Sequence, residues 1–146
     1  MKTTQSFAII LAGFLAAAMA AHAADAKEDK KAAASEKKAT KPFKNADAVE
    51  FDKLRADKQN VVLDVRTKKE FEAGHIPGAL NIDVSAADFE AKVAKLEKDK
   101  TYLVHCGAGV RSVKACEKMN QLNFPKLVNL EGGFRAWEKA GKPVEK

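Results

Sequence analysis

Short apolar segments alternate with longer amphipathic ones between residues 43 and 146. Four of the apolar segments have the length and composition of strands buried on both faces of a parallel sheet. We expect these strands over residues 61–65, 79–82, 102–105 and 127–130. Strands that alternate with helices in this way predict an α/β fold, in which a mainly parallel sheet is covered by helices on both faces.

Capping side chains mark the starts of the first two helices. Asp47 or Asn45 can cap a helix over residues 48–56. Thr67 can cap a second, short helix, and Glu70 stands three residues after it, as in a capping box. Both helices are therefore expected to begin directly after their capping residues.

Apolar residues at helical spacing indicate three further helices. Ser85 is expected to cap the first of them, and two consecutive glycines precede the last. The residues expected on their apolar faces are Phe89, Val93 and Leu96, then Val113, Cys116 and Met119, and finally Phe134 and Trp137. This spacing makes Cys116 a small core residue, so we expect no disulfide between Cys106 and Cys116.

The segment between the strand that ends at His105 and the next helix carries the candidate chemistry, because ligands of such folds bind beyond the carboxyl ends of strands. It consists of Cys106, Gly107, Ala108, Gly109, Val110, Arg111 and Ser112. Small residues let the backbone curl around the thiol, and loop amides together with a helix N-terminus favour an anion there. We expect a pKa for Cys106 below its ordinary value, with Arg111 adding a positive charge.

The N-terminal residues have the pattern of a secretory signal peptide. Lys2 precedes an unbroken apolar run over residues 7–21, and Ala-His-Ala at 21–23 fits the small-x-small cleavage pattern. The run is short for a membrane span, which needs about 20 apolar residues. We therefore expect residues 1–23 to be a signal peptide, cleaved after Ala23, and a periplasmic protein.

Residues 24–42 are rich in Ala, Lys and acidic residues and contain no aromatic or β-branched apolar residue. Such a segment buries too little surface to offset its ordering entropy, so we expect a flexible tether. The domain is then expected over residues 43–146. Of the net charge of +6, the domain carries +3 and the tether +2.

This modest charge favours small anionic substrates and argues against nucleic acid as a partner. No other segment is apolar enough to cross a bilayer, so no membrane association is expected once the leader is removed. Cys and His residues are not grouped at metal-ligand spacing, so we expect no metal and no cofactor. We expect a monomer.

Three ordered motifs make the domain resemble the rhodanese family. The first comprises Asp64-Val65-Arg66, Glu70-Phe71, Gly74-His75-Ile76-Pro77-Gly78-Ala79 and Asn81. The second is the loop from Cys106 to Ser112, which is similar to the active-site loop of the family. The third is the segment Leu130-Glu131-Gly132-Gly133-Phe134-Arg135-Ala136-Trp137. The resemblance implies a five-stranded parallel sheet flanked by helices.

The resemblance also implies a reaction. Cys106 would be the nucleophile that takes a sulfane sulfur and becomes a persulfide, and the amides of residues 107–111 would cradle that sulfur. Arg111 would orient the loop and attract an anionic donor or acceptor. A thiol or cyanide would then remove the sulfur in a ping-pong reaction. Related phosphatases have five residues between Cys and Arg, whereas four stand between Cys106 and Arg111, which favours sulfur transfer.

The donor stays open between thiosulfate and mercaptopyruvate-like compounds. Thiosulfate sulfurtransferases with two domains tend to carry basic residues where this chain has Gly107 and Ala108. Small residues look more like the relatives that use mercaptopyruvate, although those lack an arginine at the position of Arg111. The alternative to an enzyme is a rhodanese-like binding module, or persulfide carrier, of the cell envelope. A thiol-redox sensor is disfavoured because no resolving cysteine is suitably placed.

Five other residues near these motifs are assigned structural roles, and a sixth, Ser112, has two candidate roles. Asp64 and Arg66 are expected to form an ion pair that organises the neighbouring loops. His75 is expected to be structural, and His105 to point away from Cys106, because adjacent residues of a strand face opposite sides. Trp137 is expected in the core. Ser112 is expected either to cap its helix or to donate a hydrogen bond to the persulfide.

Overall fold

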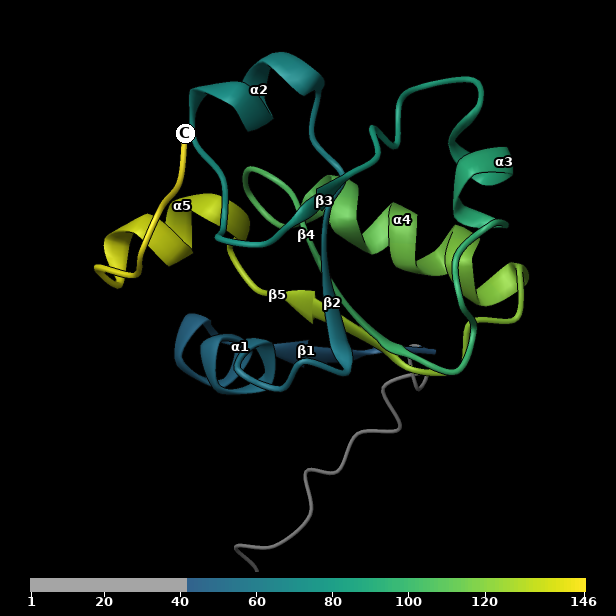
Figure 1. The fold of residues 1–146 in the computed structure, drawn as a ribbon, viewed down its shortest axis with the longest axis horizontal. Helices are drawn as coiled ribbons and strands as arrows, with labels where there is room; N and C mark the ends of the chain where they lie inside the picture. The colour runs from purple at the N-terminus through teal and green to yellow at the C-terminus, as the bar shows by residue number, and fades with distance from the viewer. Residues whose placement is uncertain (1–41) are drawn as a thin grey trace, which may run out of the picture. The chain divides into compact units, whose positions relative to one another are not determined.

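The computed structural model describes residues 42–146. Within them, five strands form one parallel sheet in the order β1-β5-β4-β2-β3 (Figure 1). The strands are β1 (Lys44–Ala46), β2 (Asn60–Asp64), β3 (Leu80–Asn81), β4 (Thr101–His105) and β5 (Leu127–Leu130). This confirms the expected α/β fold with a five-stranded sheet. The predicted leader (1–23) and all but the last residue of the predicted tether (24–42) lie outside the described residues.

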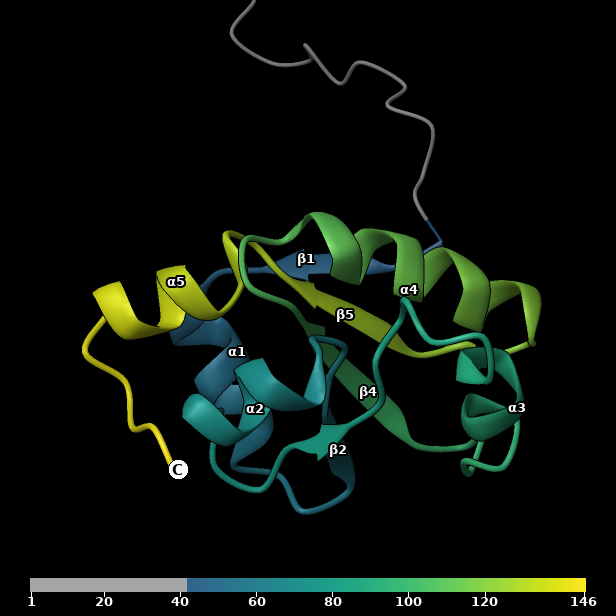
Figure 2. The same ribbon diagram turned by 90° about the horizontal axis from the view of Figure 1, so that it is seen from above.

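Five helices connect the strands of the described domain and cover both faces of the sheet (Figure 2). They are α1 (Ala48–Arg55), α2 (Lys68–Ala73), α3 (Phe89–Val93), α4 (Val110–Gln121) and α5 (Gly133–Lys139). Helices α3 and α4 share one apolar cluster with the sheet. Helices α1 and α5 share the other, in which Trp137 is fully buried, as expected.

Strands β5, β4 and β2 lie inside the sheet, and the middle residues of β2 and β4, 61–63 and 102–104, are apolar. The register of β2 and β4 pairs Leu63 with Val104 and Asp64 with His105, so both strands end at the same level. The carboxyl ends of the central strands therefore meet at one edge of the sheet, directly below the loop that follows His105.

The starts of the first two helices follow the sequence pattern. Asp47, and not Asn45, caps α1, since its Oδ1 accepts hydrogen bonds from the backbone N–H groups of Val49 and Glu50 at 2.9 and 2.8 Å. Thr67 caps α2 in a full capping box with Glu70. These local side-chain contacts were readable from the sequence because both partners lie within three residues.

One expectation was wrong, and one strand was not predicted. Ser85 does not cap α3, because Asp83 Oδ1 accepts the Ser85 N–H at 2.8 Å and holds the chain in turns until α3 begins at Phe89. Strand β1 did not stand out in the hydrophobic pattern, because only Ala46 of its three residues is buried. It forms by pairing with β5, in which every residue is buried.

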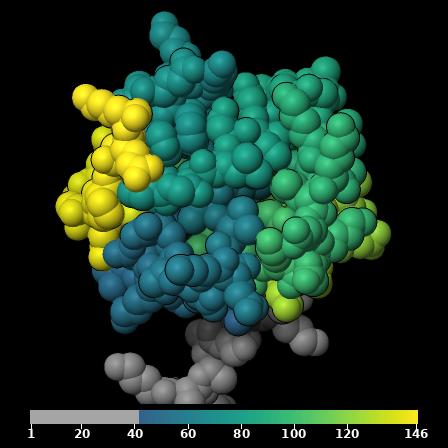
Figure 3. All heavy atoms as spheres, in the orientation of Figure 1, coloured from purple at the N-terminus to yellow at the C-terminus, as the bar shows by residue number. Residues whose placement is uncertain are grey.

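The C-terminal residues fold back along the molecule toward α2. The backbone N–H of His75 donates to Glu145 O at 2.8 Å, and the N–H of Glu145 donates to His75 O at 2.9 Å. Figure 3 shows these residues, in yellow, at the surface beside the teal segment that carries α2. Among residues 42–146, no helix is long and apolar enough to span a membrane.

Candidate active site

The predicted loop lies at the carboxyl end of β4, between that strand and the start of α4 at Val110. Cys106 follows His105 directly and is 1% exposed. Gly109 adopts a left-handed conformation (φ 89°), which lets the chain turn sharply into α4. The structure thus brings the predicted cradle residues around Cys106, while the exposed Val110 lies at its rim.

The sulfur of Cys106 is surrounded by hydrogen-bond donors. The backbone N–H of Gly109 donates to Sγ at 3.1 Å, and Ser112 Oγ lies 3.5 Å from Sγ. Burial raises the pKa of the Cys106 thiol, but the Ser112 hydroxyl and the amides of Ser112, Ala108 and Gly109 outweigh burial and lower it overall. The site therefore favours a thiolate, as a nucleophile requires.

Cys116 has the opposite environment. It is fully buried on α4, and burial raises its pKa to about 12. Both cysteines are free thiols, so the expected absence of a disulfide agrees with the structure. Both cysteines border the same apolar cluster, but only Cys106 also receives hydrogen bonds from loop amides.

The first residues of helix α5 anchor the loop through backbone hydrogen bonds. The N–H of Phe134 donates to Cys106 O at 2.6 Å, and the N–H of Arg135 donates to Gly107 O at 3.1 Å. Because the C=O and N–H of one peptide unit point in opposite directions, anchoring the Gly107 carbonyl turns the Ala108 N–H toward the sulfur. The start of α5 therefore orients the amides of the cradle.

Gly133 is the residue that allows this approach. A Cβ at this position would collide with Cys106 O and would lie 2.7 Å from Gly109 N and 2.8 Å from Ala108 N. Its φ of 60° is also a left-handed conformation. The sequence analysis placed the Gly132-Gly133 pair before the last helix and in the third family motif, but did not predict its contact with the loop. The contact was missed because it joins segments far apart in the chain.

Arg111 forms a bidentate ion pair with Glu70 of α2. Its Nη1 donates to Oε2 at 2.8 Å and its Nη2 to Oε1 at 2.7 Å. The hydrogen bonds from Arg111 lower the pKa of Glu70 to about 2, against the effect of burial, and the same contacts raise the pKa of Arg111. The sequence analysis placed Glu70 in the capping box and in the first family motif, but did not predict its contact with Arg111. The carboxylate also ties α2 to the loop, which favours a loop-orienting role for Arg111.

The structure contains the expected ion pair between Asp64 and Arg66. Both side chains are buried, and Arg66 Nη2 lies 2.6 Å from Asp64 Oδ2. The same nitrogen donates to Gly74 O at 2.7 Å, and the guanidinium lies over the Phe134 ring, 4.1 Å from its centroid. The pair therefore joins β2, the turn after α2 and helix α5 beneath the pocket.

Neither histidine near the motifs contacts the sulfur. His105 is fully buried between Phe51 and Phe134 on the far face of the sheet, and burial lowers its pKa to about 4. His75 stacks on Phe71, and its Nδ1 lies 3.0 Å from Phe71 O. Both positions agree with the structural roles expected from the sequence.

Ser112 does not cap α4, because the helix begins at Val110 and no side chain caps it, but Ser112 lies close to the Cys106 sulfur. Its Oγ is 3.1 Å from Gly109 O as well as 3.5 Å from Cys106 Sγ. The residue at the cap position of α4 is Gly109, which has no side chain to cap the helix. The Ser112 hydroxyl is thus available to the sulfur when the sulfur carries a negative charge.

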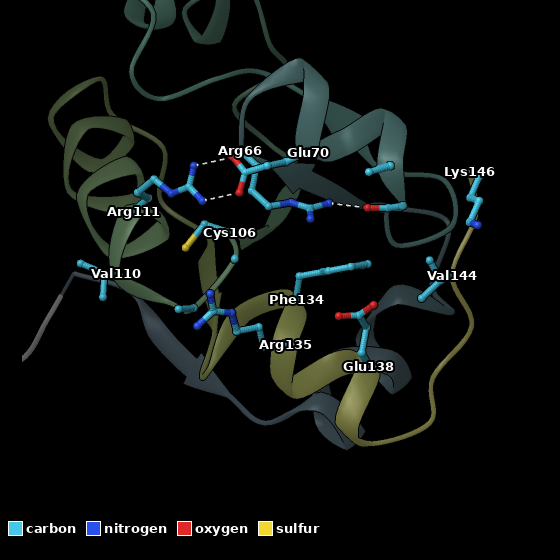
Figure 4. A pocket seen from close by; sticks show the side chains of 14 residues that line it. Arg66, Glu70, Cys106, Val110, Arg111, Phe134, Arg135, Glu138, Val144 and Lys146 are labelled. Carbon is cyan, nitrogen blue, oxygen red and sulfur yellow. Dashed lines mark hydrogen bonds and ion pairs between the residues drawn. The ribbon is translucent and has the colours of Figure 1, made fainter.

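A pocket of about 460 Å³ opens beside the loop (Figure 4). Its walls come from the loop, α2, α5 and the C-terminal segment. The lining residues are Arg66, Glu70, Ala73, Gly74, Cys106, Gly107, Ala108, Val110, Arg111, Phe134, Arg135, Glu138, Val144 and Lys146. Residues 42–146 contain no cluster of three or more His, Cys, Asp or Glu side chains that could hold a metal ion.

Known proteins are similar to this chain in sequence and in fold. The family model of the rhodanese-like domain matches residues 47–140. The chain is 39% identical over 92 residues to YtwF of Bacillus subtilis, covering 63% of this chain and 86% of that protein. It is 33% identical over 90 residues to a sulfurtransferase of Allochromatium vinosum, covering 61% and 82% of the two chains.

The fold comparison agrees with the sequence comparison. The crystal structure of a rhodanese-related protein from Thermoplasma volcanium matches with a TM-score of 0.64 and 35% identity, covering 70% of this chain and 98% of the other. The region that the family model matches, residues 47–140, contains all three motifs noted in the sequence, including the whole loop from Cys106 to Ser112. The chain therefore belongs to the rhodanese-like domain family, whose relatives include sulfurtransferases.

Proposed function

We propose that the protein is a sulfurtransferase in which Cys106 carries the transferred sulfur as a persulfide. The observation that supports this most strongly is the environment of Cys106 Sγ, where loop amides and the Ser112 hydroxyl lower the thiol pKa despite burial. A thiolate is the nucleophilic form of cysteine. The same donors suit a persulfide anion, which places negative charge one atom further into the pocket.

In the first half of the reaction, the Cys106 thiolate attacks the sulfane sulfur of an anionic donor. With thiosulfate, a Cys106 S–S bond forms, the S–S bond of thiosulfate breaks, and sulfite leaves with the bonding electron pair. Charge is conserved, because a thiolate and a dianion become a persulfide anion and a dianion. A mercaptopyruvate-like donor is the second candidate, in keeping with the small side chains at Gly107 and Ala108.

In the second half, a thiophilic acceptor attacks the outer sulfur of the persulfide. Cyanide takes this sulfur as thiocyanate, and a thiolate takes it as a new persulfide. In both cases the electron pair of the Cys106 S–S bond returns to Sγ and restores the thiolate. This is covalent ping-pong catalysis, in which one nucleophile divides the transfer into two displacements.

Arg111 is proposed to orient the loop, with Glu70 as its partner. Both terminal nitrogens of the guanidinium are hydrogen-bonded to the carboxylate, which fixes the first turn of α4 against α2. A fixed loop keeps its amide groups directed at the sulfur and avoids reorganisation during the reaction. Its positive charge stays close to the pocket, where it also favours anionic donors.

The size of the loop supports sulfur transfer over phosphate chemistry. Four residues separate Cys106 from Arg111, and the bonds from Gly109 and Ser112 converge on a single sulfur atom. A non-catalytic binding module is less well supported, because such a role requires neither the lowered thiol pKa nor the amides directed at Sγ.

We also propose that the protein is exported to the periplasm. The support is the sequence of residues 1–23, with a positive residue, an apolar run and a small-x-small site. Expression of the full chain in a Gram-negative host, followed by fractionation and N-terminal sequencing, tests this. We expect a periplasmic product beginning at Ala24, and an intact N-terminus in the cytoplasmic fraction would contradict it.

The sulfurtransferase proposal is tested by thiocyanate formation from thiosulfate and cyanide, with mercaptopyruvate as a second donor. The wild-type chain is expected to turn over with at least one of them. The Cys106→Ser variant is expected to lose this activity, while Cys116→Ser serves as the matched control and keeps it. Equal turnover by wild type and Cys106→Ser would refute the assignment.

A further inference from the structure

Residues 142–146 form a C-terminal strap that runs from α5 back to the turn after α2 (Figure 1). They follow the region that the family model matches, residues 47–140. Two of them, Val144 and Lys146, line the active-site pocket. The strap therefore supplies one wall of the pocket from outside the matched region.

Hydrogen bonds hold the strap on both sides of Val144. On one side, the indole Nε1–H of Trp137 donates to Pro143 O at 2.8 Å. On the other side, Glu145 and His75 exchange two backbone hydrogen bonds, at 2.8 and 2.9 Å. Because Trp137 is fully buried and both anchors use backbone groups of the strap, the position of Val144 is fixed by its two neighbours in the chain.

The Val144 side chain packs against the turn after α2. A Cβ added to Gly74 would lie 3.2 Å from Val144 Cγ1 and 3.8 Å from Phe134 Cζ, so both side chains lie close to this glycine. Val144 keeps 40% of its surface exposed and lines the pocket. The valine therefore closes the pocket at the place where the turn after α2 and the first turn of α5 approach each other.

The strap and the reactive sulfur lie at opposite ends of the pocket. Figure 4 shows Cys106 at one end, Val144 and Lys146 at the other, and Phe134 between them. Because Cys106 is 1% exposed, a molecule that reacts with its sulfur must enter the pocket, which measures about 460 Å³. The body of such a molecule extends along the Phe134 ring toward the strap, and a body that is too long meets Val144.

We propose that the C-terminal strap is an end wall that limits the size of the molecules that exchange sulfur with Cys106. Val144 is then a specificity-determining residue of the site. Short donors and acceptors fit between the sulfur and the strap, whereas a long, rigid body is excluded. This inference rests on the proposed sulfurtransferase function for its biological meaning, but the wall itself can be tested on the thiol alone.

The test compares two alkylating reagents with the same reactive group, iodoacetamide and N-(1-pyrenyl)iodoacetamide. With both, the Cys106 thiolate attacks the methylene carbon, a C–S bond forms, and iodide leaves with the electron pair of the C–I bond. At about 30 Å³ per heavy atom, the two reagents occupy about 150 and about 630 Å³. The first value lies below the pocket volume of about 460 Å³ and the second above it. Intact mass measures each rate, and peptide mapping confirms the site.

The first variant is a chain that ends at Pro143 and so lacks residues 144–146. It retains the hydrogen bond from Trp137 to Pro143 and the ion pair of Lys142 with Asp52, which keep the rest of the strap in place. We expect the truncation to accelerate the pyrenyl reagent about tenfold, or about 1.4 kcal/mol in the barrier, because steric overpacking is relieved. The rate with iodoacetamide is expected to stay unchanged.

The second variant, Val144→Phe, keeps the chain length and is expected to slow the pyrenyl reagent several-fold, because the larger side chain shortens the pocket. Val49→Phe is its matched control, since Val49 is 51% exposed on α1 and does not line the pocket. It is expected to leave both rates unchanged.

The proposal is overturned if the truncation changes both reagents by the same factor, or if Val144→Phe behaves like Val49→Phe. Sulfur uptake from thiosulfate by the same preparations tests the sulfurtransferase function separately. A protein that shows the expected alkylation rates but takes up no sulfur from any donor would contradict that function and leave the end wall intact.

Discussion

Replacing Glu70 with glutamine removes the charge that binds Arg111 while keeping the shape of the side chain. Glutamine also serves at the third position of a capping box, so the contact with Thr67 at the start of α2 is retained. The substitution therefore isolates the ion pair between α2 and the active-site loop. We expect it to destabilise the fold at neutral pH.

The size of the effect follows from the exposure of the pair. A hydrogen bond to a charged group is worth about 1.5–3 kcal/mol when it is shielded from water. The side chains of Arg111 and Glu70 are 36% and 38% exposed, so solvent screening reduces the contribution to about 1 kcal/mol. For a domain of this size, that corresponds to a fall in Tm of about 4 °C.

The pH dependence of the free energy of unfolding tests the contribution of the ion pair more specifically. The pKa of Glu70 is lowered from 4.5 to about 2 in the folded protein, so its stabilisation is complete above pH 4.5 and is lost as the pH falls toward 2. Urea unfolding, followed by the fluorescence of the single tryptophan, Trp137, measures the difference between wild type and Glu70→Gln. We expect that difference to shrink between pH 4.5 and pH 2.

The matched control is Glu72→Gln on the same helix. Glu72 is 62% exposed and lies 3.6 Å from Lys68, so its loss is expected to change stability little at any pH. A Glu70→Gln penalty that is equal to that of Glu72→Gln at pH 7, or that stays constant down to pH 2, would refute the reasoning.

Two further substitutions test how the loop is built. Gly133→Ala is expected to destabilise the fold by about 3 kcal/mol in urea unfolding and to abolish sulfur uptake, because the added Cβ meets the loop backbone in a left-handed conformation; normal uptake would contradict this. Ser112→Ala is expected to raise the Cys106 pKa, so the pH profile of its alkylation by iodoacetamide should move to higher pH. An unchanged profile would show that the hydroxyl does not stabilise the thiolate.

Much of the fold was readable from the sequence because its signals are local. Strands β4 and β5 follow the apolar runs at 102–105 and 127–130 closely, and the capping box of α2 joins residues three positions apart. Strand β1 was missed because its formation depends on a partner strand about 80 residues away, and not on its own composition.

The residues of the candidate site also fall into those that a local sequence pattern identifies and those that it does not. The Cys106 loop could be identified because its thiol, its small residues and Arg111 lie within six positions. The ion pair of Arg111 with Glu70 spans 41 positions. The contacts of Gly133 with the loop span from 24 (133 − 109) to 27 (133 − 106) positions, so neither follows from local pattern. Both partners stood in the family motifs, but only the folded chain shows what they contact.

The central claim is that Cys106 itself accepts the sulfur, and intact mass spectrometry tests it most directly. After incubation with a donor and removal of small molecules, wild type and Cys116→Ala are expected to gain the mass of one sulfur atom. Cys106→Ser is expected to gain none, and cyanide is expected to remove the added mass. The claim is contradicted if Cys106→Ser gains the same mass, or if peptide mapping places the sulfur on Cys116.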